Sequence, residues 1–250
     1  MCRLSKIFLV VLFMTVAMAQ SPEPPLSDTR IPISALLRED IFAGFLSDDM
    51  ERFARGEKNI QTLLETRPAD KSNLLAWKAS ATTYRAVRAL EANRNDEFRQ
   101  KYQESLALFS QARKAGPDDF GVSAITGGTY AVFADRLPQE YRAAAWSQAY
   151  NAYQELWKAQ EPVVDKLPTH MKGELLGGLA VSAMRTGRAE EAMRHVDKIL
   201  DSLAGTPYEP VAKKWKENPK VAAAGASITC LTCHEQGRLA ARLNSLNGAK

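Results

Sequence analysis

Cysteine is scarce in this sequence, with three residues in a chain of 250. Cys2 lies at the start of the chain, whereas Cys230 and Cys233 lie together near its end. Three cysteines in this arrangement cannot build a framework of several long-range disulfide bridges, which is how many small exported domains are stabilised. Stability therefore has to come from an apolar core, which a chain of this length is able to bury.

A strong charge of either sign is also lacking. The chain has 33 basic and 29 acidic residues, for a formal net charge of +4. Removal of Arg3 and Lys6 with a cleaved leader would bring this net charge to about +2. No block of like charge stands out, so nothing in the composition points to a nucleic-acid partner or to an anionic membrane surface.

Long hydrophobic runs are missing, and the clearest apolar run extends from Ile7 to Met18. It is shorter than the roughly 20 residues that span a bilayer as a helix. Two basic residues precede it, and Ala17-Met18-Ala19 has the small-x-small form of a cleavage site. We therefore predict a signal peptide over residues 1–19 and a mature chain that begins near Gln20.

This interpretation places the mature protein outside the cytoplasm, in the periplasm or cell envelope. It also predicts that no transmembrane segment remains after signal cleavage. The alternative is an uncleaved N-terminal anchor, although the length of the apolar run is more typical of a signal peptide.

Strand patterns are the remaining absence. From Ile33 onward, Ala, Leu, Glu, Gln, Lys and Arg dominate, and Val, Ile and Thr do not alternate with polar residues. The expected fold is all-α. Residues 20–32 are predicted to be a flexible, proline-rich lead-in, residues 33–218 a helical domain, and residues 219–250 a linker with a C-terminal segment. The last expected helix of the domain covers Tyr208 to Asn218.

Four segments of the helical domain share one layout. Each has a small residue at position i, larger apolar residues at i+4 and i+7 (alanine in one segment), and a proline shortly afterwards. A small residue permits close approach of a neighbouring helix, and the proline prevents the helix from continuing. The i+7 members are spaced by 49, 44 and 43 residues. The segments are Gly56-Ile60-Leu63-Pro68, Ser105-Phe109-Ala112-Pro117, Ala149-Tyr153-Leu156-Pro162 and Ala192-Val196-Ile199-Pro207.

These features resemble tetratricopeptide repeats. Residues 105–117 are similar to the second helix of such a repeat, and Trp77 and Tyr84 match the aromatic positions of its first helix. Residues 186–192 resemble its inter-helix turn. The resemblance implies an α-solenoid, an array of antiparallel helix pairs whose surface docks a protein partner.

The period departs from the family value of about 34 residues. We expect the extra residues to lengthen the connections between paired helices, at Glu91 to Glu97 and at Asp135 to Tyr141. An ordinary helical bundle with chance similarity is the alternative.

The most informative motif is Cys230-Leu231-Thr232-Cys233-His234. It is typical of c-type haem attachment, in which two thiols one helical turn apart bond to the porphyrin vinyl groups and the next histidine coordinates the iron. We predict one covalent haem c, with Cys230 and Cys233 as thioether residues and His234 as the proximal iron ligand. Attachment outside the cytoplasm agrees with the predicted export.

Three other interpretations of the motif stay open. A thioredoxin-like thiol pair is one, although such pairs open a helix after a strand, and no strand is predicted. A zinc site would need a fourth ligand from elsewhere in the chain. A structural disulfide within the motif is the third.

The C-terminal position of the motif on a helical body is similar to the cytochrome c′ class. Only 16 residues follow His234, and none is Met or His, so any sixth ligand has to come from upstream. The candidates are His170 and Met171. His195 is expected to be a solvated histidine among charged neighbours, and Met184 a core residue.

No catalytic constellation is recognisable. The aromatics at helical spacing, Trp77, Tyr84, Tyr130, Trp146, Tyr153 and Trp157, are expected to fill the core. The glycine pairs at 127–128 and 177–178 are expected to permit close helix packing rather than to bind phosphate. The sequence thus favours an electron carrier, or the haem subunit of an envelope redox complex, that docks a redox partner on its helical surface. The alternative is an exported adaptor whose motif is structural, metal-binding or thiol-redox.

Overall fold

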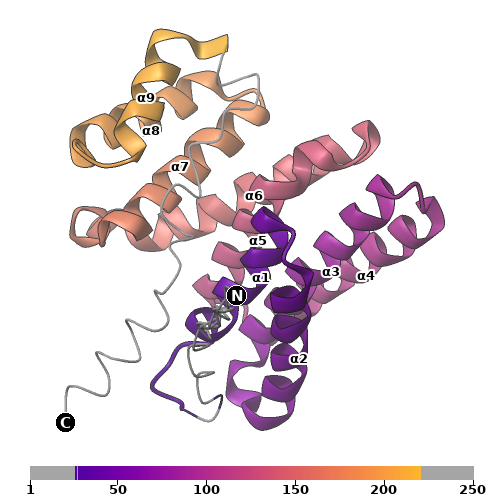
Figure 1. Cartoon of the computed structure of the whole chain (residues 1–250). Coiled ribbons are helices and arrows are strands. Elements are labelled where there is room, and N and C mark those ends of the chain that lie inside the picture. The colour runs from indigo at the N-terminus through magenta and orange to yellow at the C-terminus, as the bar shows by residue number, and fades with distance from the viewer. Residues whose placement is uncertain (1–25, 27, 221–250) are drawn as a thin grey trace, which may run out of the picture.

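The computed structural model describes residue 26 and residues 28–220, and this part of the chain consists of helices joined by short connections (Figure 1). The described residues contain nine α-helices and three short 3-10 turns, and no strand occurs among them. The all-α prediction is confirmed for this part of the chain. The α-helices are α1 Ile33–Ser47, α2 Met50–Thr66, α3 Lys71–Glu91, α4 Asn95–Ala115, α5 Phe120–Phe133, α6 Gln139–Gln160, α7 Thr169–Arg185, α8 Ala189–Ser202 and α9 Tyr208–Glu217. The 3-10 turns are η1 Pro68–Asp70, η2 Ala134–Arg136 and η3 Glu161–Lys166.

Consecutive helices form antiparallel pairs, and the most extensive contacts join α3 to α4, α5 to α6, α7 to α8 and α1 to α2. In three of these pairs, α1–α2, α3–α4 and α7–α8, a tight turn of a few residues connects the two helices. Asp48, Asn93 and Gly187 stand at the turns with φ of 54°, 59° and 79°. A left-handed residue after the last helical turn is a common way to end a helix, because it redirects the chain at once.

The first helices of the pairs, α1, α3, α5 and α7, run parallel to one another as a layer. The Trp77 indole of α3 donates to Ser34 Oγ of α1 at 3.4 Å, and Tyr84 Oη donates to the Gly44 carbonyl at 2.7 Å. Between α3 and α5, Thr129 Oγ1 donates to Ser80 Oγ at 2.7 Å. These contacts, of which the last two are buried, fix the register of α1, α3 and α5 relative to one another.

The second helices, α2, α4, α6 and α8, carry the sequence pattern described above. All twelve of its small and apolar members are buried, which confirms that the pattern marks the core-facing side of these helices. A Cβ at Gly56 would lie 2.9 Å from Ile41 Cδ1 of α1, closer than real Cβ atoms approach. A small residue at this position therefore favours the close approach of the paired helix.

Tyr153 of α6 is a large residue that packs against small ones on both neighbouring helices. Its ring lies between Gly127 of α5 and Gly178 of α7, where a Cβ would come within 3.0 Å and 2.1 Å of ring atoms. One glycine of each pair thus permits close packing, as predicted. Gly128 differs, because a Cβ there would meet nothing within 4 Å.

Two expectations about the connections need correction. Glu91 to Glu97 is not an extended link, because α3 continues to Glu91 and α4 begins at Asn95. The extra residues belong to the end of α3 and the start of α4, so they lengthen these two helices and not the connection between them. The second stretch is partly a connection, with η2 in it, but α6 already begins at Gln139.

The end of the predicted lead-in belongs to the folded unit. Ile31 is fully buried, and its carbonyl accepts a hydrogen bond of 3.1 Å from Arg67 Nη1. An apolar side chain directly before α1 packs on the core, which removes the freedom expected for this part of residues 20–32.

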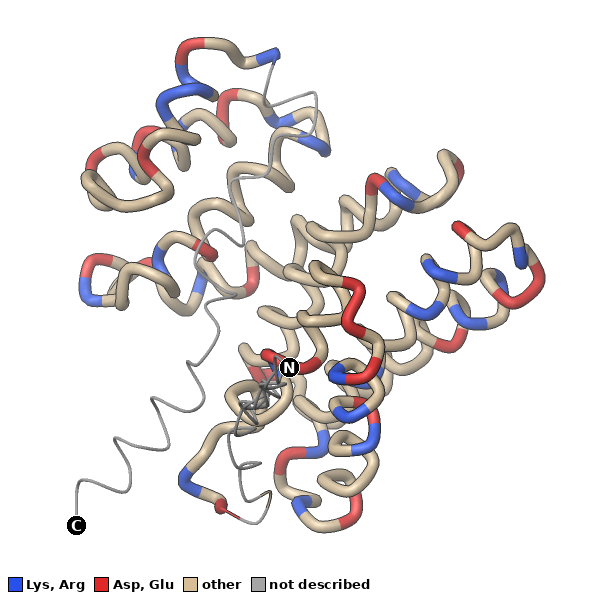
Figure 2. The backbone as a smooth tube through the Cα atoms, viewed as in Figure 1, with Lys and Arg blue, Asp and Glu red and all other residues tan. Residues whose placement is uncertain are grey.

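Acidic and basic residues are interspersed along most helices, whereas α5 carries none (Figure 2). Among residues 26 and 28–220, no helix is both long and apolar enough to cross a membrane.

Candidate functional site

The predicted haem motif, Cys230 to His234, lies outside the described residues, as does the predicted signal peptide. The described residues do include the upstream candidates for the sixth iron ligand. The structure separates them into two groups: His170 and Met171 at the start of α7, and His195 within α8.

His170 and Met171 lie in the first turn of α7, directly after η3 and Pro168. Pro168 occupies the position before the helix, where the missing N–H of proline costs little. Lys172 Nζ donates to the Asp165 carbonyl at 3.1 Å, which ties this first turn to η3. Met171 is 46% exposed and His170 is half-buried. Both candidates are therefore accessible from solvent on a positioned element.

His195 is buried, and the expectation of a solvated histidine is wrong. Only 9% of the residue is exposed, and its ring meets the Trp157 ring edge-on at a centroid distance of 5.5 Å. Its Nε2 lies 3.8 Å from Glu191 Oε1. The charged sequence neighbours suggested solvent, but the α8 face that holds His195 is covered by α6. A ring enclosed in this way is unsuited to ligate an iron carried by another segment.

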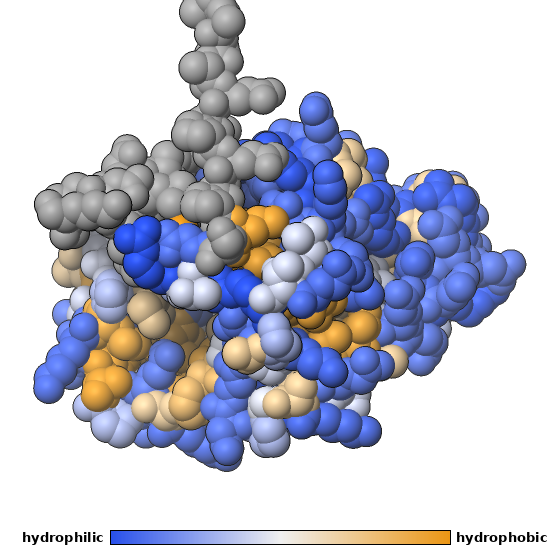
Figure 3. Space-filling view, turned by 90° about the horizontal axis from the view of Figure 1, so that it is seen from below, coloured by the Kyte–Doolittle hydropathy of each residue, from blue (hydrophilic) through white to orange (hydrophobic). Residues whose placement is uncertain are grey.

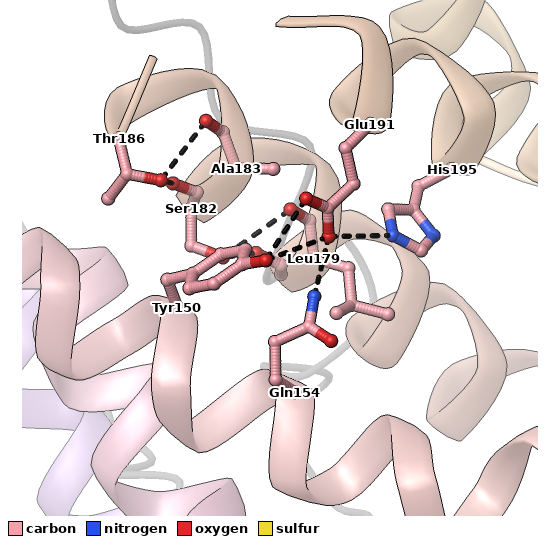
Figure 4. A network of polar contacts seen from close by, with 9 residues as sticks. Tyr150, Gln154, Leu179, Ser182, Ala183, Thr186, Glu191 and His195 are labelled. Atoms are coloured by element: carbon pink, nitrogen blue, oxygen red, sulfur yellow. Dashed lines mark hydrogen bonds and ion pairs between the residues drawn. The ribbon is translucent and has the colours of Figure 1, made fainter. Parts of the chain in front are cut away.

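Glu191 is the centre of a polar network between α6 and α8 (Figure 4). Tyr150 Oη donates to its carboxylate at 3.0 Å, and Gln154 Nε2 donates to it at 2.6 Å. The Arg188 guanidinium lies 4.2 Å from the centroid of the Tyr150 ring. Tyr150 and Gln154, one turn apart on α6, thus face the side of α8 that carries Glu191. The contacts join the second helices of two neighbouring pairs.

The environment acts on the titrating groups of this network. Burial lowers the pKa of His195, although the nearby Glu191 carboxylate works in the opposite direction. Burial and the hydrogen bond to Glu191 raise the pKa of Tyr150. These shifts favour a protonated phenol and a neutral imidazole, and the hydrogen bonds of Tyr150 and Gln154 to the Glu191 carboxylate link α6 to α8.

We expect His195 to make stability depend on pH. The ordinary pKa of 6.5 applies in the unfolded chain, and the folded value is lower. The unfolded state therefore binds more protons as pH falls below about 6.5, and stability is lost down to the folded pKa. Each unit of pKa difference is worth about 1.4 kcal/mol. Urea unfolding of the native protein and His195→Asn at several pH values should show that this slope is missing in the variant. If His195→Asn keeps the native slope, then other groups cause the acid sensitivity.

Other polar clusters among the described residues have structural partners. Asp40 of α1 is buried and accepts from Arg52 Nε at 3.1 Å and from Arg55 Nε at 2.7 Å, which joins α1 to α2. A groove beside α3 contains the ion pairs Arg85–Glu57 and Lys101–Glu104, so its charges largely balance. Within residues 26 and 28–220, no group of three His, Cys, Asp or Glu residues is placed to hold a metal ion.

The α6–α8 network was not identified from the sequence. A signal was present, because Tyr150 and Gln154 are four residues apart, as are Glu191 and His195, which puts each pair on one helix face. The pattern does not show that the two faces meet, since that depends on how the helix pairs stack.

Comparison with known proteins finds no matching family model, no matching curated protein and no matching solved structure. The function is therefore argued from the residues of this chain.

Proposed function

We propose that this chain is an exported c-type haem protein that transfers single electrons in the periplasm or cell envelope, alone or as the haem subunit of a redox complex. The observation that carries the proposal is the cysteine complement. After cleavage near Gln20, both remaining cysteines fall in one Cys-x-x-Cys-His motif. Haem attachment requires two thiols at this spacing followed directly by histidine, and in the mature chain neither thiol has a cysteine outside the motif to pair with.

Each residue has a role in this proposal. Cys230 and Cys233 form the two thioethers, and His234 is the proximal iron ligand. His170 or Met171 is the candidate for the sixth position. The donor set fits the group, because imidazole and thioether are the usual axial ligands of c-type haems, and both candidates lie at the surface of α7. A haem bound in this way supplies one-electron oxidation and reduction.

We further propose that the helical body is a divergent tetratricopeptide-like array that docks a redox partner. The antiparallel pairs, the parallel layer of first helices and the buried repeat positions support this assignment. Trp77 and Tyr84, the two family-like aromatics, are both buried on α3, a first helix. Stacked helix pairs expose an extended surface to a protein partner. The likeness to cytochrome c′ is then local to the haem motif.

A second function is an exported adaptor whose motif is structural, metal-binding or thiol-redox. The stacked helix pairs expose an extended surface, which supports a binding role for the helical body. The first function requires a covalently attached haem, whereas the adaptor has none.

Absorbance and mass separate them. Protein purified from a host with haem-attachment machinery should show a Soret band that survives acid–acetone extraction, and an intact mass with one added haem. The covalent thioethers resist extraction, whereas a non-covalent haem does not. A colourless protein of unmodified mass, from a host that attaches haem to a control cytochrome, would rule out the first function and favour the adaptor.

A further inference from the structure

Exposed apolar side chains gather at one corner of the array. Among the described residues, four large hydrophobic side chains are strongly exposed, and three of these are Phe120 at 49%, Val163 at 43% and Met171 at 46%. They belong to the start of α5, to η3 and to the start of α7. We call these three residues, together with His170, the α5–α7 corner. Apolar side chains also interrupt the hydrophilic surface on the face seen in Figure 3.

The helix register brings the members of the corner to one level. Gly127 and Gly178 both contact the ring of Tyr153, so α5 and α7 are level at these glycines. Phe120 and Met171 each lie seven residues before them, which is about two helical turns. Both helices run antiparallel to α6. At the start of α5, Ser123 Oγ donates to Glu155, near the end of α6, at 2.7 Å. At the end of α7, the Arg185 guanidinium lies 5.4 Å from the ring of Trp146, near the start of α6.

The end of α6 fills the space between these two helix starts. Gln160 follows Tyr153 by seven residues and is the last residue of α6, and η3 begins directly after it. Val164 of η3 is buried in a cluster with Leu175 and Leu179 of α7. The neighbouring Val163 therefore projects from the corner on a turn that is itself packed against α7.

We propose that the α5–α7 corner is the docking surface for this chain's own haem-bearing segment, residues 221–250, so that the apolar porphyrin covers Phe120, Val163 and Met171. This inference rests on the proposed haem function. Isolated apolar side chains at a protein surface are ordinary. A group of three that includes one candidate axial ligand, Met171, and adjoins the other, His170, is typical of a binding surface.

The length of the chain permits this docking. Tyr208, the first residue of α9, packs against Gly173, and its hydroxyl donates to Glu174 at 2.8 Å, so α9 begins about one turn from Met171. The ten residues of α9 extend about 15 Å. The nine residues 221–229 can span up to about 30 Å before Cys230. The haem motif can therefore return to the corner.

The sequence of the segment suits an apolar surface. Leu239, Leu243 and Leu246 follow the motif with helical spacing and would share one side of a helix. These leucines and the porphyrin are the apolar parts of the segment, and docking on the α5–α7 corner would bury them.

Soret circular dichroism of the full-length holoprotein tests the proposal. A haem held against one asymmetric surface gives a strong Soret signal, whereas a haem on a freely moving segment gives a weak one. Phe120→Ser and Val163→Ser should each weaken docking roughly tenfold, because each removes a large apolar contact. The two together should abolish most of the Soret signal. Leu46→Ser is the matched control, because Leu46 is also 49% exposed but lies at the end of α1.

Intact mass, read on the same samples, separates this proposal from the haem function. One haem per chain in every variant, with a Soret signal lost only in the corner variants, supports docking. One haem per chain with no effect of the corner substitutions, or a weak signal in the native protein, overturns docking and leaves the haem function standing. A native protein without haem overturns the haem function itself.

Two further measurements keep the test decisive. Far-ultraviolet circular dichroism should show unchanged helix content, because the substituted side chains are exposed. Sedimentation should show one oligomeric state for all variants. A change of that state in the corner variants, with the Soret signal intact, would assign the corner to contact between two copies and overturn docking of the segment.

Discussion

Replacing both Cys230 and Cys233 with alanine should abolish covalent haem while the helical body still folds. Each thioether needs its own sulfur, so either single variant should retain one attachment point, and the double variant none. The helical body should survive because α1 to α9 already form a continuous core without this segment. Intact mass, acid–acetone extraction and thermal unfolding by circular dichroism measure the two effects separately.

Substitutions within and beyond the motif sharpen this result. Thr232→Ala is the matched control, because it changes a spacer position and should leave haem content unchanged. His234→Ala should keep the covalent bond but change the absorption spectrum, because the iron loses its proximal ligand. Replacing His170 and Met171 in turn should alter the spin state for the residue that ligates. If the double cysteine variant unfolds the whole chain instead, the motif acts as a structural staple.

Gly178→Ala should destabilise the fold by about 2 to 3 kcal/mol, although alanine is the better helix former. The new Cβ would lie 2.1 Å from two atoms of the Tyr153 ring. The ring cannot retreat, because Gly127 of α5 already approaches it from the other side with a clearance of 3.0 Å for a Cβ. Urea unfolding at constant pH would measure the loss.

Gly128→Ala is the matched control. It lies in a helix like Gly178, but its Cβ would enter open space. It should stabilise the protein by about 0.5 to 1 kcal/mol through helix propensity alone. In a Tyr153→Leu background, the cost of Gly178→Ala should largely disappear, because the ring that causes the clash is missing. Equal costs in both backgrounds would show that this clash is not the cause.

Much of the fold follows from local sequence patterns. The repeated small-apolar-apolar spacing predicts the buried faces of α2, α4, α6 and α8, because residues at i, i+4 and i+7 share one side of a helix. The stretch around Gly187 predicts a tight turn, and this residue has the positive φ that glycine adopts without strain. Such features depend on a few neighbouring residues and can be identified without tertiary contacts.

The errors concern features that local patterns do not specify. The start of α4 could not be recognised from the sequence, because the residues after the turn at Asn93, Arg94 to Glu97, are all polar and fit a loop as well as an exposed helix start. The glycine pairs show the same limit. Gly127 and Gly128 are adjacent and equivalent in sequence, but only Gly127 contacts Tyr153.

The amino-acid sequence alone determined the helical class, the core-facing side of each second helix and the placement of two of the three cysteines in one motif. These properties depend on composition and on spacing within single segments. The environment of His195 and the α5–α7 corner depended on tertiary packing. His195 is enclosed by Trp157 and Glu191, and the corner joins the starts of α5 and α7 around the end of α6. Burial is a property of neighbouring surfaces, and here those surfaces come from helices that are distant in the chain.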